Sequence, residues 1–254
     1  MRRILSAKNF PVLQRFAFSN VLLAFDFDGT LAPLIANPDS GAIRHGTRRL
    51  LRILTCRYPC IVVSGRSRAD VQRRLRGIGF EEAIGNHGIE PWNSSHSVAQ
   101  LVKTWIPVLT QKLGSVGGVV LENKRFSLSI HYRMARSKRA ARKAIIDVAQ
   151  TLAGAKLVGG KLVVNVVPKG APDKGLAVER ERKRRRCDKV IYVGDDETDE
   201  SVFALAPHSR YLTIRIGAKQ SSRARFYIRN QRGIDRLLKS LIELRSDHPT
   251  GPPS

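Results

Sequence analysis

Three short apolar segments, each followed at once by small or acidic residues, constrain the fold more than any other feature of the sequence. They are Val21–Phe25, Cys60–Val63 and Val190–Val193. Runs this short and this apolar are typical of central strands in a parallel sheet, which are buried on both faces. Basic amphipathic segments follow them at about 44–56, 67–76 and 174–186. The alternation predicts a parallel α/β core whose ligands bind at the carboxyl ends of the strands.

The middle of the chain has a different pattern, which predicts two hairpins and a helix. The expected strands lie at Gly117–Glu122, Arg125–Arg133, Lys156–Val158 and Lys161–Val167, and the expected helix at Ala135–Leu152. Asn123-Lys124 and Gly159-Gly160 are the expected turns of the two hairpins. Together these elements predict a small antiparallel α+β unit inserted into the core.

The predicted organisation is therefore a core domain interrupted by a cap. We expect the first part of the core at 1–96, the cap at 97–167, the second part of the core at 168–245 and a disordered Pro/Ser/Gly-rich tail at 246–254. The chain has 254 residues, of which 42% are hydrophobic, so it can bury a core and a smaller second domain. No stretch approaches the roughly 20 apolar residues of a spanning helix, so we expect a cytoplasmic protein without a membrane partner.

The charge of the chain is strongly positive. Lys and Arg number 45 against 21 Asp and Glu, which gives a net charge of +24. A charge of this size favours anionic partners, either nucleic acid or a phosphorylated small molecule. The basic residues are spread over many segments, and the interleaved aromatic platforms of a single-strand binder are absent from the sequence. We therefore expect a small-molecule partner rather than nucleic acid, and the sequence is compatible with a monomer.

Asp26 and Asp28 follow the first predicted strand, separated by a single residue. An aspartate carboxylate is a competent nucleophile for phosphoryl transfer, and a second carboxylate can protonate the leaving oxygen and then take a proton from water. Gly29 lets the chain turn sharply away from the strand. An isolated pair of this kind is weak support, but its position after a buried strand predicts a phosphoryl-transfer site.

Residues that could hold a phosphate occur in two further places. Ser64-Gly65-Arg66 follows the second strand and opens a helix, where a hydroxyl and free backbone N–H groups can bind an anion. Ser64 alone would be interpreted as a helix N-cap. Lys174 begins a later helix near the strand ends and could neutralise a carboxylate and a phosphate held close together.

The segment Gly194–Glu200 follows the third strand and holds five acidic residues in seven positions. A helix N-terminus favours one or two acidic residues through its dipole, but not five. A hard cation would relieve their mutual repulsion, and Mg²⁺ prefers carboxylate oxygens together with a substrate phosphate. This segment therefore predicts a magnesium site at the same edge of the sheet.

Taken together, these segments resemble the four motifs of the haloacid dehalogenase (HAD-like) superfamily of phosphohydrolases, in the same order. Within that superfamily the chain is similar to the trehalose-6-phosphate phosphatases. The closer resemblance rests on Gly194–Glu200, Gly85–Glu90, Glu122-Asn123-Lys124 and His131-Tyr132-Arg133. It covers about residues 20–235 and implies a HAD-like α/β fold, with a parallel three-layer core and an inserted α+β cap.

The resemblance also implies roles for individual residues. Asp26 would be the nucleophile and Asp28 the general acid and base. Mg²⁺ would be held by the Asp26 carboxylate, the Asp28 carbonyl and Asp195, with Asp199 nearby. The implied substrate-binding residues are Ser64, Gly65, Arg66, His87, Glu122, Lys124, His131, Arg133, Asn165 and Lys174.

The expected cap strand at 125–133 alternates between polar and apolar residues, so a polar face carrying His131 and Arg133 is expected to turn toward the active site. One departure from the resemblance concerns the next hairpin. Similar phosphatases usually carry a glutamate and an arginine three residues and one residue before the proline that begins the return to the core. Asn165 and Val167 occupy these places before Pro168. By alternation both are expected to face the sugar.

The leading interpretation is a phosphoric monoester hydrolase of trehalose biosynthesis. It would convert trehalose 6-phosphate to trehalose and phosphate through an aspartyl-phosphate on Asp26. The change at Asn165 and Val167 leaves open another sugar phosphate or a glycosyl-phosphoglycerate as substrate. A third interpretation is a nucleic-acid-binding protein on a retained phosphatase fold, and the intact Asp26, Asp28, Lys174 and Asp195 speak against it.

Overall fold

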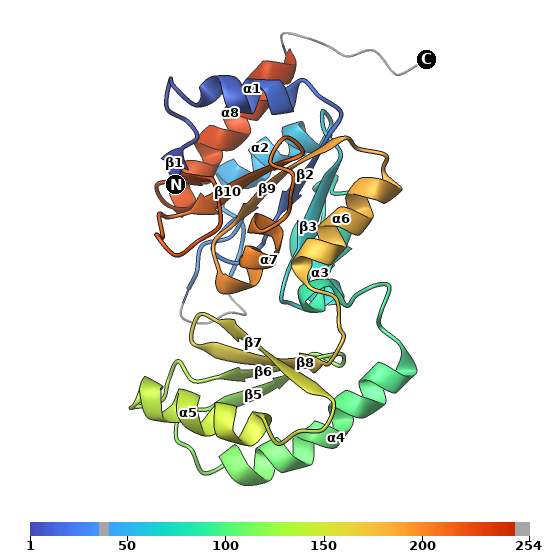
Figure 1. The fold of residues 1–254 in the computed structure, drawn as a ribbon, viewed down its shortest axis with the longest axis vertical. Helices are drawn as coiled ribbons and strands as arrows, with labels where there is room; N and C mark the ends of the chain where they lie inside the picture. The colour runs from blue at the N-terminus through green and yellow to red at the C-terminus, as the bar shows by residue number, and fades with distance from the viewer. Residues whose placement is uncertain (36–40, 247–254) are drawn as a thin grey trace.

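The core of the protein is one sheet of parallel strands (Figure 1). A computed structural model describes residues 1–35 and 41–246. Seven strands pair in the order β1-β11-β10-β9-β2-β3-β4, and every pairing is parallel. Their bounds are β1 Arg2–Arg3, β2 Val21–Phe25, β3 Cys60–Val63, β4 Glu82–Ile84, β9 Lys189–Gly194, β10 Tyr211–Ile216 and β11 Phe226–Ile228. The three strands predicted from the apolar runs are β2, β3 and β9, and they lie next to one another in the middle of the sheet.

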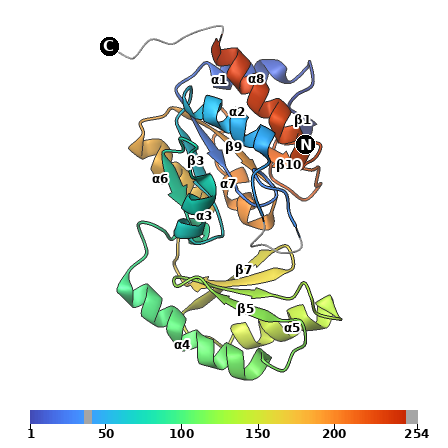
Figure 2. The same cartoon turned by 180° about the vertical axis from the view of Figure 1, so that it is seen from behind.

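Helices cover both faces of this sheet, as the apolar character of the central strands requires. On β2, Val21, Leu23 and Phe25 pack in one hydrophobic cluster, whereas Leu22 and Ala24 pack in another. The first cluster includes residues of α1, α2, α3 and α8, and the second includes residues of α6 and α7 (Figure 2). The bounds are α1 Phe10–Ala17, α2 His45–Thr55, α3 Arg68–Leu75, α6 Lys174–Arg184, α7 Glu200–Phe203 and α8 Ile234–Ser246. The predicted three-layer α/β core is confirmed.

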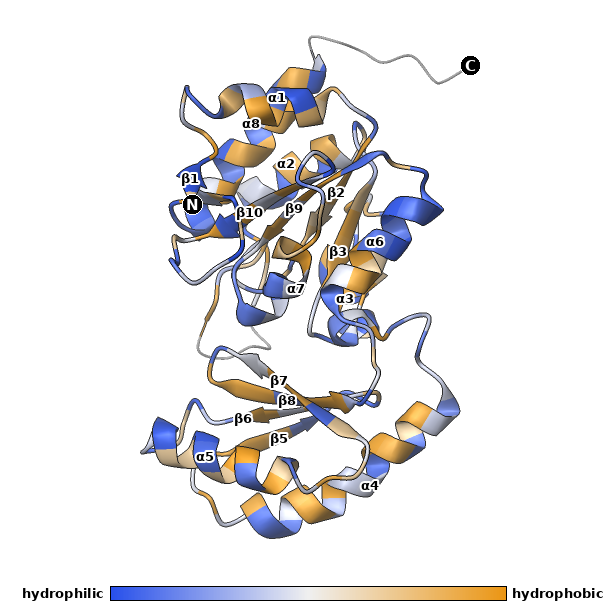
Figure 3. Ribbon diagram, in the orientation of Figure 1, coloured by the Kyte–Doolittle hydropathy of each residue, from blue (hydrophilic) through white to orange (hydrophobic). Residues whose placement is uncertain are grey.

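A second, smaller sheet faces the carboxyl ends of the core strands. Its four strands pair antiparallel in the order β5-β6-β8-β7. The elements of this cap are α4 His96–Leu113, β5 Val120–Asn123, β6 Leu128–His131, α5 Lys138–Ala149, β7 Ala155–Gly160 and β8 Val163–Pro168. Leu128, Ile130 and Val164 pack in one cluster with residues of α4 and α5. These two helices lie on the side of the cap sheet that is away from the core (Figure 3).

The turns of the cap hairpins differ from the sequence prediction. Gly159 and Gly160 belong to β7, and the reversal is at Lys161-Leu162, where Leu162 has a φ of 61°. Gly159 lies near the core, since a Cβ atom there would lie 2.7 Å from Oε2 at the end of the flexible Glu197 side chain. In the other hairpin Asn123 pairs with Leu128, so the loop spans residues 124–127 rather than a tight turn at Asn123-Lys124.

Three short 3₁₀ turns, η2 Asn86–Gly88, η3 Glu197–Asp199 and η4 Gln231–Gly233, complete the description. The division of the chain at 97 and 167 stays a prediction. Of the tail predicted to be disordered, 246–254, all but Ser246 lies outside the described residues. Within the described part of the chain, none of the helices has the length and apolar character needed to cross a membrane.

Candidate active site

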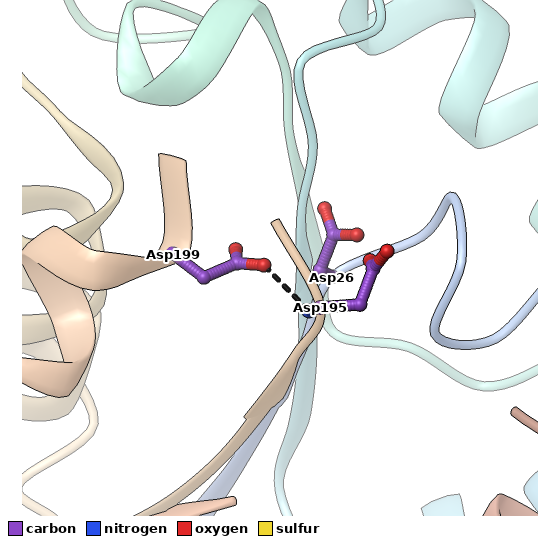
Figure 4. A group of neighbouring side chains, drawn as sticks. All are labelled: Asp26, Asp195 and Asp199. Atoms are coloured by element: carbon purple, nitrogen blue, oxygen red, sulfur yellow. Dashed lines mark hydrogen bonds between the residues drawn. The ribbon is translucent and has the colours of Figure 1, made fainter. Parts of the chain in front are cut away.

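Three carboxylates from two neighbouring strand ends meet above the middle of the core sheet. Asp26 directly follows β2, Asp195 directly follows β9, and Asp199 ends the 3₁₀ turn η3. One oxygen of each lies within 4.8 Å of the others, and Figure 4 shows Asp199 reaching the loop of Asp195 from the side opposite Asp26. Adjacent parallel strands bring their carboxyl ends together, which is why residues so far apart in sequence share one site.

Lys174 ties two of these carboxylates together. Its Nζ lies 2.7 Å from Oδ1 of Asp26 and 2.7 Å from Oδ1 of Asp199. The Lys174 side chain is 2% exposed and that of Asp26 is 6% exposed. Although burial opposes the charged form, the two carboxylates raise the pKa of Lys174 above its ordinary value. The lysine is therefore a fixed positive charge beside Oδ1 of Asp26, and Oδ2 is left free to react.

Asp199 is fully occupied by hydrogen bonds. Its Oδ1 also accepts from Oη of Tyr192 at 2.6 Å. Its Oδ2 accepts from the backbone N–H groups of Asp195 at 2.8 Å and Asp196 at 2.9 Å. These four bonds place Lys174 and fix the loop that carries Asp195.

The group carries more negative charge than its own lysine can neutralise. The carboxylates of Asp26, Asp195 and Asp199 contribute three negative charges and Lys174 one positive charge, which leaves two uncompensated. Burial, reinforced by Asp199, raises the pKa of Asp195 to about 7. Burial likewise raises the pKa of Asp26, against the influence of Lys174. Oxygen donors with two excess negative charges fit a hard divalent cation, so this triad could bind a metal ion.

Asp28 lies at the edge of the same site, where Arg66 orients it. The guanidinium donates from Nε to Oδ2 at 2.6 Å and from Nη2 to Oδ1 at 2.7 Å. A second pair from Arg66 to Asp70, at 2.8 Å, fixes the arginine to helix α3. Asp28 keeps a side-chain exposure of 32%, so the oriented carboxylate stays accessible from the cavity described below.

The loop after β3 borders the cavity and carries the residues predicted to bind an anion. Ser64 is buried, and its Oγ accepts from the N–H of Arg66 at 3.2 Å, which leaves its own proton to donate. Gly65 lines the cavity. From the cap, Nζ of Lys124 reaches down to the carbonyl of Gly65 at 3.0 Å. A core loop and a cap lysine thus meet at the expected phosphate position.

The cap contributes the other wall of a cavity of about 420 Å³. On it, Nε2 of His131 lies 2.8 Å from Oε2 of Glu122, and Lys124 lies 3.6 Å from the same oxygen. Asn165 accepts from Oγ of Ser129 at 2.6 Å, which turns its amide group into the cavity wall. Ser129 and His131 alternate along β6, and with Glu122 on β5 and Asn165 on β8 they form a polar face of the cap sheet.

Most residues predicted for the site lie around this one cavity. Those lining it are Asp26, Asp28, Gly65, Arg66, His87, Glu122, Lys124, His131, Arg133, Asn165, Lys174 and Asp195. Ser64 and Asp199 are buried directly behind residues of the wall. Their individual roles stay predictions.

A sequence model of the family described as Trehalose-phosphatase matches residues 24–230, which include the whole cavity wall. The chain belongs to the trehalose-phosphatase family. It is 34% identical over 209 residues to the trehalose-phosphate phosphatases of Mycobacterium ulcerans and Mycobacterium tuberculosis, and this covers 75% of the chain and 53% of each relative. The chain therefore spans about half the length of the curated relatives it matches.

Solved structures show the same fold. The C-terminal domain of a trehalose-6-phosphate phosphatase from C. albicans superposes with a TM-score of 0.79 at 20% identity, covering 93% of this chain and 98% of that one. A sucrose-phosphatase from Synechocystis, in complex with sucrose and phosphate, gives a TM-score of 0.58 at 13% identity, with 89% and 98% covered. At these identities the likeness shows the trehalose-phosphatase fold alone.

One expectation about the candidate site is wrong. Asn165 faces the cavity, but Val167, two residues further along β8, does not line it. Val167 is 4% exposed and packs in an apolar cluster with Ile89, Ala99 and Phe126. Alternation placed both residues on the same face, but the cavity ends between them, where the cap sheet meets the core.

Sequence reasoning also missed supporting residues of the candidate site. Arg215 donates to the carbonyl of Asp195 and, at 2.9 Å, to that of Ile216, so it fixes the acidic loop from β10. Thr30 donates to Oδ1 of Asp195 at 3.3 Å. The alternating segment Tyr211–Ile216 before Gly217 is a usable signal for a further strand with Arg215 at its carboxyl end.

Proposed function

We propose that the protein is a magnesium-dependent phosphatase that hydrolyses trehalose 6-phosphate to trehalose and phosphate. The observation that carries the proposal is a single cavity with Asp26 and Lys174 on its core side and Glu122, His131 and Asn165 on its cap side. Membership of the trehalose-phosphatase family supports the same substrate. The cavity therefore offers a phosphoryl-transfer group and a polar surface for sugar hydroxyls within one enclosure.

Asp26 is the proposed nucleophile. Its Oδ1 is held by Lys174 at 2.7 Å, so Oδ2 attacks the phosphorus atom. The bond from phosphorus to the sugar oxygen breaks as the aspartyl-phosphate forms. Lys174, Ser64 and the backbone at Gly65 bind the phosphoryl oxygens and balance their charge.

Asp28 is the proposed proton carrier. It gives a proton to the sugar oxygen as that oxygen leaves, and it takes one from the water that then hydrolyses the aspartyl-phosphate. Its pair with Arg66 keeps the carboxylate at the cavity edge, which supports this role. One residue thus serves both half-reactions.

The proposed cofactor is Mg²⁺. The residues that would hold it are Asp26 and Asp195 through their side chains and Asp28 through its carbonyl. Asp199 would not bind the ion directly, because its oxygens already accept four hydrogen bonds. When bound, Mg²⁺ would supply positive charge that offsets the carboxylates and stabilises charge on the phosphoryl group.

The cap residues are the proposed sugar-binding groups. Glu122 is held by His131 and Lys124 and offers its remaining lone pairs to hydroxyls of the sugar. Although burial opposes ionisation, His131 and Lys124 lower the pKa of Glu122, so it stays a carboxylate acceptor. Arg133 and Asn165 add donors on the same wall.

The test is phosphate release from a panel of sugar phosphates, with and without Mg²⁺. The panel contains trehalose 6-phosphate, sucrose 6-phosphate, glucose 6-phosphate and a glycosyl-phosphoglycerate. We expect the highest kcat/KM for trehalose 6-phosphate, and only with Mg²⁺. A preference of tenfold or more for another ester would favour one of the alternative substrates. Asn165 is the reason to include them, because this residue has no carboxylate to bind sugar hydroxyls. Retention on nucleic acid that weakens with salt, without turnover of any ester, would contradict an enzymatic function.

A further inference from the structure

His87 is a buried histidine whose ring nitrogens make no hydrogen bond of good geometry in the described part of the chain, although the Asn165 side chain approaches the ring. The residue is 8% exposed, and Nδ1 and Nε2 are both buried and unpartnered. The ring lines the same cavity as Asp26 and Lys174. Since buried polar atoms are nearly always paired, two orphaned nitrogens beside a cavity indicate that a ligand supplies their partners.

The backbone around His87 is held in a conformation that few residues adopt. Asn86 has a φ of 50° and His87 a φ of 60°, in the left-handed region that favours glycine. The Asn86 side chain donates to Glu90 at 2.6 Å and accepts from Ser127 of the cap. The N–H of His87 donates to the carbonyl of Ser64 at 2.9 Å. These bonds maintain the unusual backbone and with it the position of the ring.

The ring lies where the phosphate loop meets the cap. It covers Gly65 so closely that a Cβ atom there would lie 2.5 Å from Cε1 of His87 and 2.9 Å from Nε2. Lys124 and Lys174 are close enough to act on its charge, and Asn165 of the cap lies beside it. Gly65 belongs to the proposed phosphate seat and Asn165 to the proposed sugar wall, so the ring stands at the junction of the two.

The environment keeps the ring neutral. Burial, with Lys124 and Lys174 adding to it, lowers the pKa of His87 to about 3. A neutral imidazole has one N–H donor and one acceptor nitrogen. A phosphoryl oxygen can only accept, whereas a sugar hydroxyl can donate. A neutral ring at the junction can therefore donate to the phosphate of a sugar phosphate and accept from a hydroxyl of its sugar.

We propose that His87 is a specificity-determining residue that bridges the two halves of the substrate, donating to a phosphoryl oxygen and accepting from a hydroxyl of the adjacent sugar ring. This inference rests on the proposed function, because it requires a sugar phosphate in the cavity. One core residue would then favour ligands that carry a phosphoryl group and a sugar hydroxyl in the same molecule.

The test compares two substrates in the full-length protein. One is the sugar phosphate that the wild-type enzyme turns over fastest, and the other is p-nitrophenyl phosphate, which has no sugar hydroxyl. We expect His87→Phe to lower kcat/KM for the sugar phosphate by about 30- to 1,000-fold, mainly through KM, because one hydrogen bond to a charged phosphoryl oxygen and one to a neutral hydroxyl are lost. The loss for p-nitrophenyl phosphate should be smaller by about 2- to 10-fold, because that ester has no sugar hydroxyl to lose.

Three comparisons decide the outcome. His87→Gln keeps a donor and an acceptor and should recover most of the sugar-phosphate activity. His96→Phe, at the start of α4 with its ring on Gln100, is the matched control and should change neither substrate. Equal losses for both substrates, or no loss in His87→Phe, would overturn the proposal, and so would a wild-type enzyme that hydrolyses no sugar phosphate. If a sugar phosphate other than trehalose 6-phosphate is preferred, the proposed function fails while the role of His87 is still measured.

Discussion

The core half and the cap half of the site are built in different ways. On the core side, Asp26, Asp199 and Lys174 have side-chain exposures of 6%, 0% and 2% and bond to one another. On the cap side, Glu122 and His131 are 47% and 30% exposed. Substitution in the core group therefore disturbs several buried charged bonds at once, whereas Glu122 and His131 of the cap wall keep contact with solvent. The departure at Asn165 lies on the cap wall, while every core motif is intact.

Among the predictions that test this difference between core and cap, substitution of the proposed nucleophile should have the largest effect on activity. Asp26→Asn should abolish turnover of every phosphate ester, by on the order of 10⁴-fold or more, because an amide is a poor nucleophile. The amide oxygen can still accept from Lys174, so the fold should be retained. Phosphate release and circular dichroism of the variant measure the two expectations. Near-normal activity would show that the covalent mechanism is wrong.

Removal of the cation should be nearly as severe. EDTA is expected to stop activity, because the excess negative charge of the acidic triad would then oppose a phosphate dianion. Added Mg²⁺ should restore the rate, and Ca²⁺ should inhibit, since it takes a looser and higher coordination. The measurement is phosphate release during metal titration of the chelated protein. Full activity in metal-free buffer would rule out the proposed cofactor.

The proton carrier should give an intermediate effect that depends on the leaving group. Asp28→Asn is expected to slow hydrolysis of a sugar phosphate by about 10²- to 10⁴-fold, because the sugar oxygen needs a proton to leave. p-Nitrophenyl phosphate, whose leaving group needs little protonation, should suffer much less. Arg73→Gln is a control, since Arg73 is exposed and pairs with Asp70 outside the cavity. Equal slowing of the two esters would argue against this role for Asp28.

The smallest of the expected effects concerns the cap wall. Asn165→Glu should lower KM for trehalose 6-phosphate by about 10- to 150-fold, the value of one charge-assisted hydrogen bond, with little change in kcat. Ser129 can still donate to the new carboxylate. Steady-state kinetics test this. Tight binding by the wild type that is lost in Asn165→Glu would show that the wall was interpreted wrongly.

Val167→Arg is the matched variant on the same strand. Its guanidinium would enter the apolar cluster with Ile89, Ala99 and Phe126. An unpaired buried charge is destabilising by on the order of 3 kcal/mol or more, so the expected result is a lower melting temperature rather than a lower KM.

The sequence predicts the core better than the cap for a physical reason. The runs that became β2, β3 and β9 are buried on both faces, so their composition alone distinguishes them. The family motifs then place Asp26, Asp195 and Lys174 at one sheet edge. By contrast, Gly159-Gly160 was interpreted as a turn because glycine permits turning, whereas both glycines pair within β7 and the chain reverses at Lys161-Leu162. Where a hairpin reverses depends on the register of its two strands, which composition alone does not record.

The same limit explains Val167 and Arg215. Strand alternation predicts which face a residue occupies, but it does not predict where along that face a cavity ends. The apolar partners of Val167 come from both sides of the cap junction, and Arg215 acts through a carbonyl on the neighbouring strand. Both facts depend on how elements pack, which neither composition nor spacing records.

The cluster around Val167 also restricts the order in which substitutions can accumulate. A glutamate at 165 changes a cavity wall and leaves the junction intact, so it can arise first. An arginine at 167 becomes tolerable only after Phe126 or Ile89 has been replaced, because those side chains fill the space and offer no acceptor. The effect of a charge at position 167 therefore depends on its neighbours, whereas the effect of one at position 165 does not. A lineage that exchanged a charged pair for Asn165 and Val167 could regain the first charge in one step, but not the second.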